Sequence, residues 1–123
     1  QSVCSQLKGE GIRVSLFLNA DISMVQSAAK TGAERVELYT GTFSEVYSVD
    51  KEKAVSKHVE TAKLAGKVGL GVNAGHDLNL KNLSFYKERV PNLLEVSIGH
   101  ALIADALYYG IKNTIHMYLK RLL

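Results

Sequence analysis

The feature that most constrains this chain's fold is a fourfold alternation of short apolar runs and longer amphipathic segments. The apolar runs predict strands at 14–18, at 35–40, from 68 onward and at 93–98. A helical pattern follows each run, and the unit repeats about every thirty residues. Alternating strands and helices predict an α/β fold in which a parallel sheet is joined by right-handed crossovers.

The helices are predicted from apolar residues three or four apart and from residues that start or stop helices. A helix tail is expected at 1–11, with further helices at 23–31, 51–64, within 77–90, at 101–109 and at 111–123. Asp21 or Ser23 can cap the helix at 23–31, and Pro91, the only proline, can end the one within 77–90. We expect residues 41–50 to form a loop.

Two architectures fit this pattern, a doubly wound open sheet and part of a (β/α)8 barrel. A complete barrel needs about 250 residues, so the 123 residues of this chain correspond to about half of one. A dinucleotide-binding sheet carries a glycine-rich turn after its first strand. The turn after Leu18 is instead Asn-Ala-Asp, which disfavours that alternative.

Composition indicates one ordinary globular domain, with 46% hydrophobic and 22% charged residues. The net charge of +3 is dispersed along the chain, so we expect no nucleic-acid partner. The single cysteine favours a reducing compartment, the cytoplasm. No apolar run of transmembrane length and no signal-peptide pattern is present, so no membrane partner is expected. The start at Gln1 rather than Met suggests a fragment.

Two predicted strands end in the same dipeptide, Gly75-His76 and Gly99-His100. In barrel proteins the carboxyl ends of the strands carry the chemistry, and the last loops hold phosphate beside the start of a short extra helix. The helix at 101–109 is placed to be such a helix. The two Gly-His pairs therefore predict a phosphate site built from glycine amides, a helix N-terminus and two imidazoles.

Three segments closely resemble the pyridoxine 5′-phosphate synthase family: VSLFLNAD with VELYTG, VGLGVNAGHDLN, and EVSIGHALIADALYYG. The resemblance implies a TIM barrel of which residues 1–123 are the C-terminal half, strands five to eight, as one domain. It also implies condensation of 1-deoxy-D-xylulose 5-phosphate with 3-amino-2-oxopropyl phosphate, releasing inorganic phosphate and water, with no cofactor or metal. Further catalysts belong to the missing half, so we expect this chain to be inactive alone.

The resemblance also implies roles for individual residues. His76 matches a proton-donating histidine, and Glu37 matches a glutamate thought to stabilise the transition state. Gly99 and His100 match a phosphate-binding pair, and Asp77 stands at a substrate-contacting position where other members carry glycine. Tyr39 replaces a histidine of many members and is given no role. Ring formation needs proton transfers and iminium chemistry, which suit an imidazole and a carboxylate.

Structural alternatives exist for each of these residues. His76 and His100 can simply bond nearby backbone, Glu37 can pair with a lysine or arginine, and zinc binding at His76, Asp77 and His100 lacks ligand spacing. His58 and His116 are expected to be solvated. As a whole, the chain can instead be a non-catalytic phosphate-binding or structural half-barrel. An open four-strand sheet would leave two unpaired edges and an apolar inner face, so we expect a homo-oligomer or pairing with the missing half.

Overall fold

A computed structural model describes residues 2–123 and contains one sheet of four parallel strands in the order β1-β2-β3-β4. The strands are β1 (Ser15–Leu18), β2 (Arg35–Leu38), β3 (Gly71–Ala74) and β4 (Leu93–Val96). Strands that follow one another in the chain are neighbours in the sheet, as in the wall of a barrel, whereas a doubly wound sheet reverses its order. The α/β half-barrel predicted from the sequence is confirmed.

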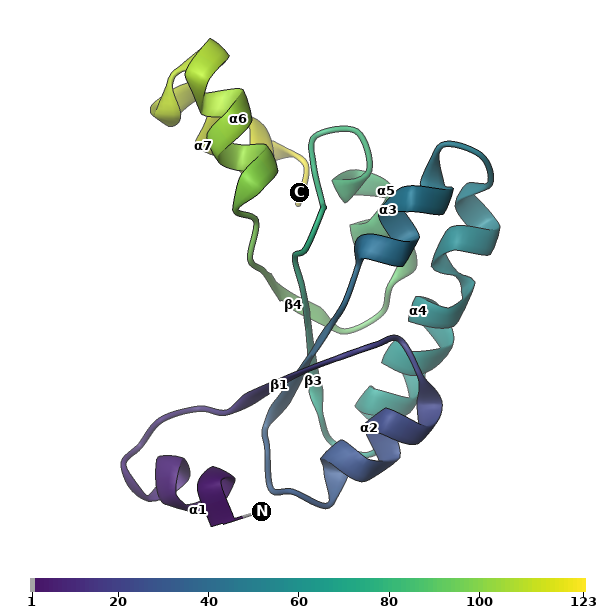
Figure 1. The fold of residues 1–123 in the computed structure, drawn as a ribbon, viewed down its shortest axis with the longest axis vertical. Coiled ribbons are helices and arrows are strands. Elements are labelled where there is room, and N and C mark those ends of the chain that lie inside the picture. The colour runs from purple at the N-terminus through teal and green to yellow at the C-terminus, as the bar shows by residue number, and fades with distance from the viewer. Residues whose placement is uncertain (1) are drawn as a thin grey trace.

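The helices are α1 (Ser2–Gly9), α2 (Ile22–Ala29), α3 (Gly41–Tyr47), α4 (Lys51–Lys67), α5 (Leu83–Arg89), α6 (His100–Tyr109) and α7 (Ile111–Lys120). Helices α2 to α5 lie on one side of the sheet, and α6 and α7 form a pair that projects from the end of β4 (Figure 1). The predicted cap is Asp21, whose carboxylate accepts a hydrogen bond from the Ser23 amide at 2.7 Å. Gln1, part of the predicted first helix, lies outside the described residues.

Two predicted elements differ substantially from the structure. Residues 41–47 form helix α3 instead of a loop, because Phe43 packs its fully buried ring against Tyr86 at a centroid distance of 4.9 Å. The third strand begins at Gly71 rather than at Val68, which ends α4 and is 40% exposed. Gly69, with φ of +80°, makes the turn between them.

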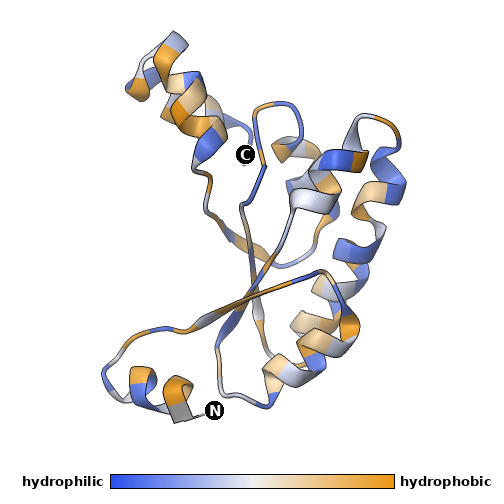
Figure 2. Cartoon of the chain, in the orientation of Figure 1, coloured by the Kyte–Doolittle hydropathy of each residue, from blue (hydrophilic) through white to orange (hydrophobic). Residues whose placement is uncertain are grey.

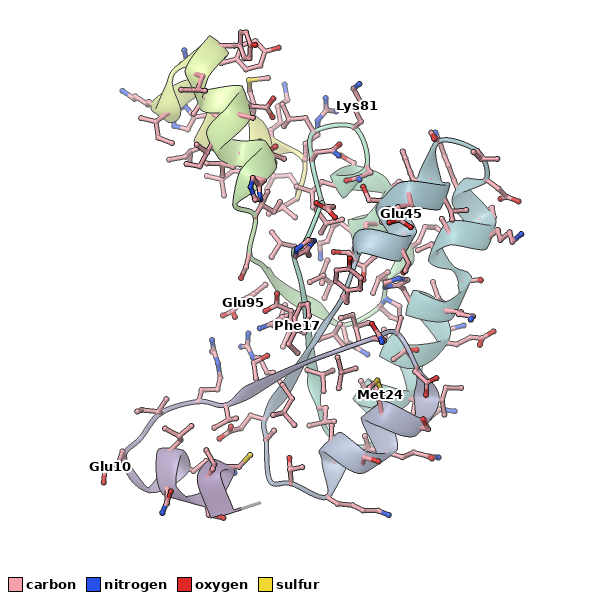
Figure 3. All side chains as sticks on the ribbon, viewed as in Figure 1. Glu10, Phe17, Met24, Glu45, Lys81 and Glu95 are labelled. Carbon is pink, nitrogen blue, oxygen red and sulfur yellow. The ribbon has the colours of Figure 1, made fainter. Side chains whose placement is uncertain are left out.

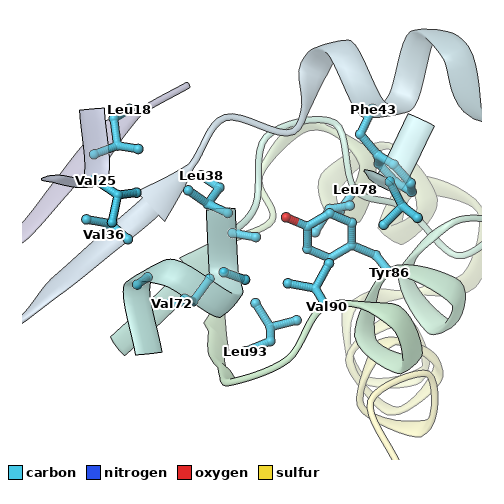
Figure 4. Close-up of a cluster of buried hydrophobic side chains, with 14 of the residues drawn as sticks. Leu18, Val25, Val36, Leu38, Phe43, Val72, Leu78, Tyr86, Val90 and Leu93 are labelled. Carbon is cyan, nitrogen blue, oxygen red and sulfur yellow. The ribbon is translucent and has the colours of Figure 1, made fainter. Parts of the chain in front are cut away.

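The core lies between the sheet and helices α2 to α5 (Figure 4). Alternate strand residues face it: Leu18, Val36, Leu38, Val72, Ala74 and Leu93 are all buried. His58 also belongs to this interior, because only 2% of it is exposed and its Nδ1 lies 2.9 Å from the Tyr86 hydroxyl. The prediction that His58 is solvated is therefore wrong, and burial lowers the pKa of His58 to about 4.

The inner face of the sheet, opposite the helices, is mainly polar with exposed Phe17 as an apolar exception, so the prediction of an apolar face is wrong. Phe17, Glu37, Asn73 and Glu95 occupy successive cross-strand positions on it, and Figure 3 labels Phe17 and Glu95, which belong to the two outer strands. Glu95 pairs with Arg13 at 2.9 Å and Arg35 at 2.7 Å. Desolvation opposes the charge of Glu95, but both guanidiniums together hold its pKa below the usual value.

Some apolar surface remains open at the ends of this half-barrel. Strands β1 and β4 each pair on one side only within residues 2–123. Hydrophobic positions on the projecting α6–α7 pair are visible in Figure 2, and Leu107 is 83% exposed. No described helix is long and apolar enough to cross a membrane.

Candidate functional site

A hollow of about 160 Å³ lies at the carboxyl ends of β2, β3 and β4. Its lining residues are Glu37, His76, Asp77, Ser97, Gly99 and His100. The structure thus brings together five residues that the sequence singled out, and adds Ser97. Because the strands are parallel and adjacent, their carboxyl ends open on one edge of the sheet, where the sequence placed the site.

His76 is held at several points. Its Nδ1 lies 3.0 Å from Oδ2 of Asp77, and its backbone carbonyl accepts a short hydrogen bond from the Thr40 hydroxyl. The Tyr39 ring meets the imidazole edge-on, with the two ring centroids 5.1 Å apart. Nε2 has no hydrogen-bond partner in the described part of the chain, so it is the imidazole nitrogen left for a ligand.

Helix α3 braces the loop that follows His76. The Asp77 carbonyl accepts hydrogen bonds from Ser44 Oγ at 3.0 Å and from the side-chain amides of Asn79 and Asn82, each at 3.3 Å. Asn82 is buried and also donates to Ser44 Oγ at 3.1 Å. These bonds hold the Asp77 carbonyl in place, and Asp77 itself has a φ of +64°, a left-handed conformation that non-glycine residues seldom adopt.

Gly75 allows two chain segments to touch. A methyl group at this position would collide with the carbonyl oxygen of Ser97, which follows β4. The close approach brings the ends of β3 and β4 together and so closes one side of the hollow. Gly75 itself does not line the hollow, and the phosphate-binding role predicted for its amide stays a prediction.

The end of β4 is built differently. Gly99 precedes α6, and a methyl group there would meet no described residue within 4 Å. The first amide of α6 to find a helical acceptor is that of Ile103, which donates to the Gly99 carbonyl at 3.0 Å. The preceding amides, including that of His100, have no acceptor within the helix and carry its positive dipole end. The His100 side chain is exposed beside them.

Glu37 has no cationic partner in the described part of the chain. Its carboxylate has no hydrogen-bond or ion-pair partner among residues 2–123, so the structural alternative of a paired Glu37 does not hold within these residues. Glu95 takes that place instead, between Arg13 and Arg35. The Glu37 carboxylate therefore faces the hollow and can interact with positive charge in a ligand.

Four residues that support the site were given no role from the sequence: Tyr39, Thr40, Ser44 and Asn82. The sequence contains one indication of helix α3, because the apolar residues Phe43, Val46 and Tyr47 have helical spacing. Thr40 and Ser44 lie near the start of this segment. In the described part of the chain, no three His, Cys, Asp or Glu side chains are grouped so that they could hold a metal ion.

A parallel half-barrel with a polar hollow at the carboxyl ends of its strands defines this molecule as part of a barrel-type α/β protein. The chain belongs to the PdxJ family, since the family model described as pyridoxal phosphate biosynthesis protein PdxJ matches residues 1–123.

Curated relatives named pyridoxine 5′-phosphate synthase are similar over nearly the whole chain. The Flavobacterium johnsoniae protein is 47% identical over 99% of this chain and 52% of its own length. The Cytophaga hutchinsonii protein is 52% identical over 98% of this chain and 50% of its own length. The chain thus spans about half the length of the curated relatives it matches.

Proposed function

We propose that this chain forms the part of a pyridoxine 5′-phosphate synthase that binds a substrate phosphate and supplies one acid catalyst. The reaction is the condensation of 1-deoxy-D-xylulose 5-phosphate with 3-amino-2-oxopropyl phosphate, and inorganic phosphate is a product. The observation that carries the proposal is the single hollow that gathers Glu37, His76, Gly99 and His100 in a member of the PdxJ family.

In this proposal the phosphate lies at the start of α6. Gly99 leaves the backbone accessible, the first amides of α6 donate to the anion, and His100 adds a donor. The Gly75 amide and the Asp77 backbone complete the surroundings from the neighbouring strand. A helix dipole and free amides bind an anion without a metal.

The catalytic roles follow from the same geometry. The free Nε2 of His76 first takes up a proton and then delivers it to the departing oxygen, a step for which an imidazole is suited near neutral pH. The unpaired carboxylate of Glu37 stabilises positive charge that develops on an iminium nitrogen. Both groups act from strand ends whose positions the sheet fixes.

Assembly is part of the proposal. The two open strand edges and the exposed residues of α6 and α7 favour contact with a second copy or with the remaining half of a barrel. Light scattering of a dilute sample tests this, and a monomer that binds no apolar dye contradicts it. We place the protein in the cytoplasm and expect the chain alone to show no turnover with both substrates.

The function is tested by a hybrid enzyme. In the hybrid, this chain replaces the matching half of the Cytophaga hutchinsonii relative. The two sequences are 52% identical over that half. We expect the hybrid to form pyridoxine 5′-phosphate from the two substrates. His76→Asn should lower kcat by about a hundredfold to ten-thousandfold, the usual loss when a general acid is removed.

The control is His116→Asn, which changes an exposed histidine on α7 and should leave kcat unchanged. A hybrid that folds but makes no product contradicts the proposed function. A hybrid in which His76→Asn retains full activity contradicts the role of His76 alone.

A further inference from the structure

We propose that Asp77 is a positioning residue that keeps the proton of neutral His76 on Nδ1 and so presents Nε2 as the nitrogen that meets the substrate. This inference rests on the proposed function, because it assigns a partner to the histidine of that site. It gives the Asp77 side chain a role toward His76 rather than toward the phosphate.

The contact determines where the proton sits. Oδ2 of Asp77 lies 3.0 Å from Nδ1 of His76, which is hydrogen-bonding distance. An ionised carboxylate only accepts hydrogen bonds, so Nδ1 must be the donor. In a neutral imidazole the other nitrogen then carries a lone pair. A carboxylate or carbonyl that holds one ring nitrogen in this way is how proteins set a histidine's orientation and tautomer.

The backbone of Asp77 is itself held in place, which keeps the Asp77 side chain beside His76. Three side chains hold its carbonyl oxygen, from Ser44, Asn79 and Asn82. The φ of +64° at Asp77 suits glycine best, and aspartate is only tolerated there. Glycine adopts this backbone conformation more readily than aspartate does. The carboxylate at this position is therefore explained by its contact with the neighbouring imidazole and not by the backbone.

Charge argues against a direct phosphate contact by the same side chain. The hollow already contains the unpaired carboxylate of Glu37, and two carboxylates do not attract a phosphate. His76 and His100 are the lining side chains that can be positive. The Asp77 carboxylate therefore weakens the attraction of the hollow for phosphate, and it orients the His76 imidazole.

The tautomer of His76 can be read directly. We would record long-range proton–nitrogen spectra of the full chain with ¹⁵N-labelled histidine at pH 8, without substrate. We expect His76 to carry its proton on Nδ1. In Asp77→Gly, which fits the left-handed backbone, the proton should move mainly to Nε2, the form that free imidazole side chains prefer. Asp77→Asn should give a mixture, because an amide both donates and accepts.

His116 and Glu37→Gln serve as controls. The exposed His116 should keep its tautomer in every variant, and Glu37→Gln removes a carboxylate from the same hollow without touching Nδ1. His76 protonated on Nε2 in the unmodified chain overturns the proposal. So does an Asp77→Gly spectrum that is unchanged, or a change with Glu37→Gln as large as that with Asp77→Gly.

Titration with inorganic phosphate separates this inference from the proposed function. Asp77→Gly should bind phosphate about threefold to fivefold more tightly, because one negative charge near the anion is gone. Tighter binding together with the tautomer change supports both ideas, whereas weaker binding in Asp77→Gly overturns the assignment of its side chain. A chain that binds no phosphate but shows the tautomer change supports the Asp77–His76 contact and contradicts the phosphate site.

Discussion

The tips of β3 and β4 carry the same Gly-His dipeptide and are held in opposite ways. At the β3 tip, Gly75 packs on the Ser97 carbonyl, and His76 is fixed by Thr40, Asp77 and Tyr39. At the β4 tip, no atom of the residues that the structure describes lies within 4 Å of a methyl group built on Gly99. The His100 imidazole there has no hydrogen-bond partner among residues 2–123.

This difference suits two different tasks. A group that transfers a proton must be oriented before the reaction, which requires a rigid surrounding. A group that binds an anion through backbone amides needs accessible donors instead, and a side chain that is free to adjust. In the function we propose, the same two residue types serve as a fixed acid at one strand end and an open anion site at the next.

The largest expected effect comes from replacing Gly75 with alanine, compared with the same replacement at Gly99. Gly75→Ala should destabilise the chain by about 3 kcal/mol, because a methyl group must displace the backbone of Ser97. Gly99→Ala, the matched variant at the other tip, should change stability by no more than about 0.5 kcal/mol. Urea unfolding of both variants measures the difference, and equal losses would contradict the contrast between the tips.

Acid should loosen the β3 tip before the β4 tip. His58 supports α3 through Phe43 and Tyr86, and burial lowers its pKa from 6.5 to about 4. The unfolded chain therefore binds a proton more readily, so stability is full above pH 6.5 and is lost as the pH falls toward 4. Between pH 7.5 and 5 the loss should be about 2 kcal/mol.

Chemical unfolding at a series of pH values measures this loss, and amide exchange locates it. Exchange in residues 75–82 should rise more than in residues 97–103 as the pH falls. His58→Gln should flatten the pH dependence between pH 7.5 and 5, whereas His116→Gln should retain it. A chain whose stability does not change across this range contradicts the buried neutral state of His58.

The smallest effect tests the brace that α3 provides. Ser44→Ala removes the hydroxyl that donates to the Asp77 carbonyl and accepts from Asn82, so it should cost about 1 kcal/mol. Ser48→Ala, at the exposed end of the same helix, is the control and should have almost no effect. Faster amide exchange confined to the β3 tip in Ser44→Ala would sharpen the comparison, and identical exchange in both variants would contradict the brace.

Much of the fold could be predicted from the sequence because its signals are local. Apolar runs, Asp21 as a cap and Pro91 as a stop identified the strands and most helices. Helix α3 was not predicted because Gly41 and Thr42 are weak helix formers. The helix is stabilised by the packing of Phe43 on Tyr86, a residue distant in the sequence. His58 was misplaced for the same reason, since its partner is 28 residues away.

For the site, the sequence alone determined which residue types stand at which strand ends, because chain order and parallel pairing put the ends of neighbouring strands on one edge. The tertiary structure decided how each residue is held. Only the fold brings Thr40, Ser44 and Asn82 to the loop after β3 and sets Asp77 against His76. It also pairs Glu95 with two arginines, while Glu37 has no ion-pair partner among the described residues. Such contacts depend on distances between residues far apart in the chain, and a linear pattern carries no information about those distances.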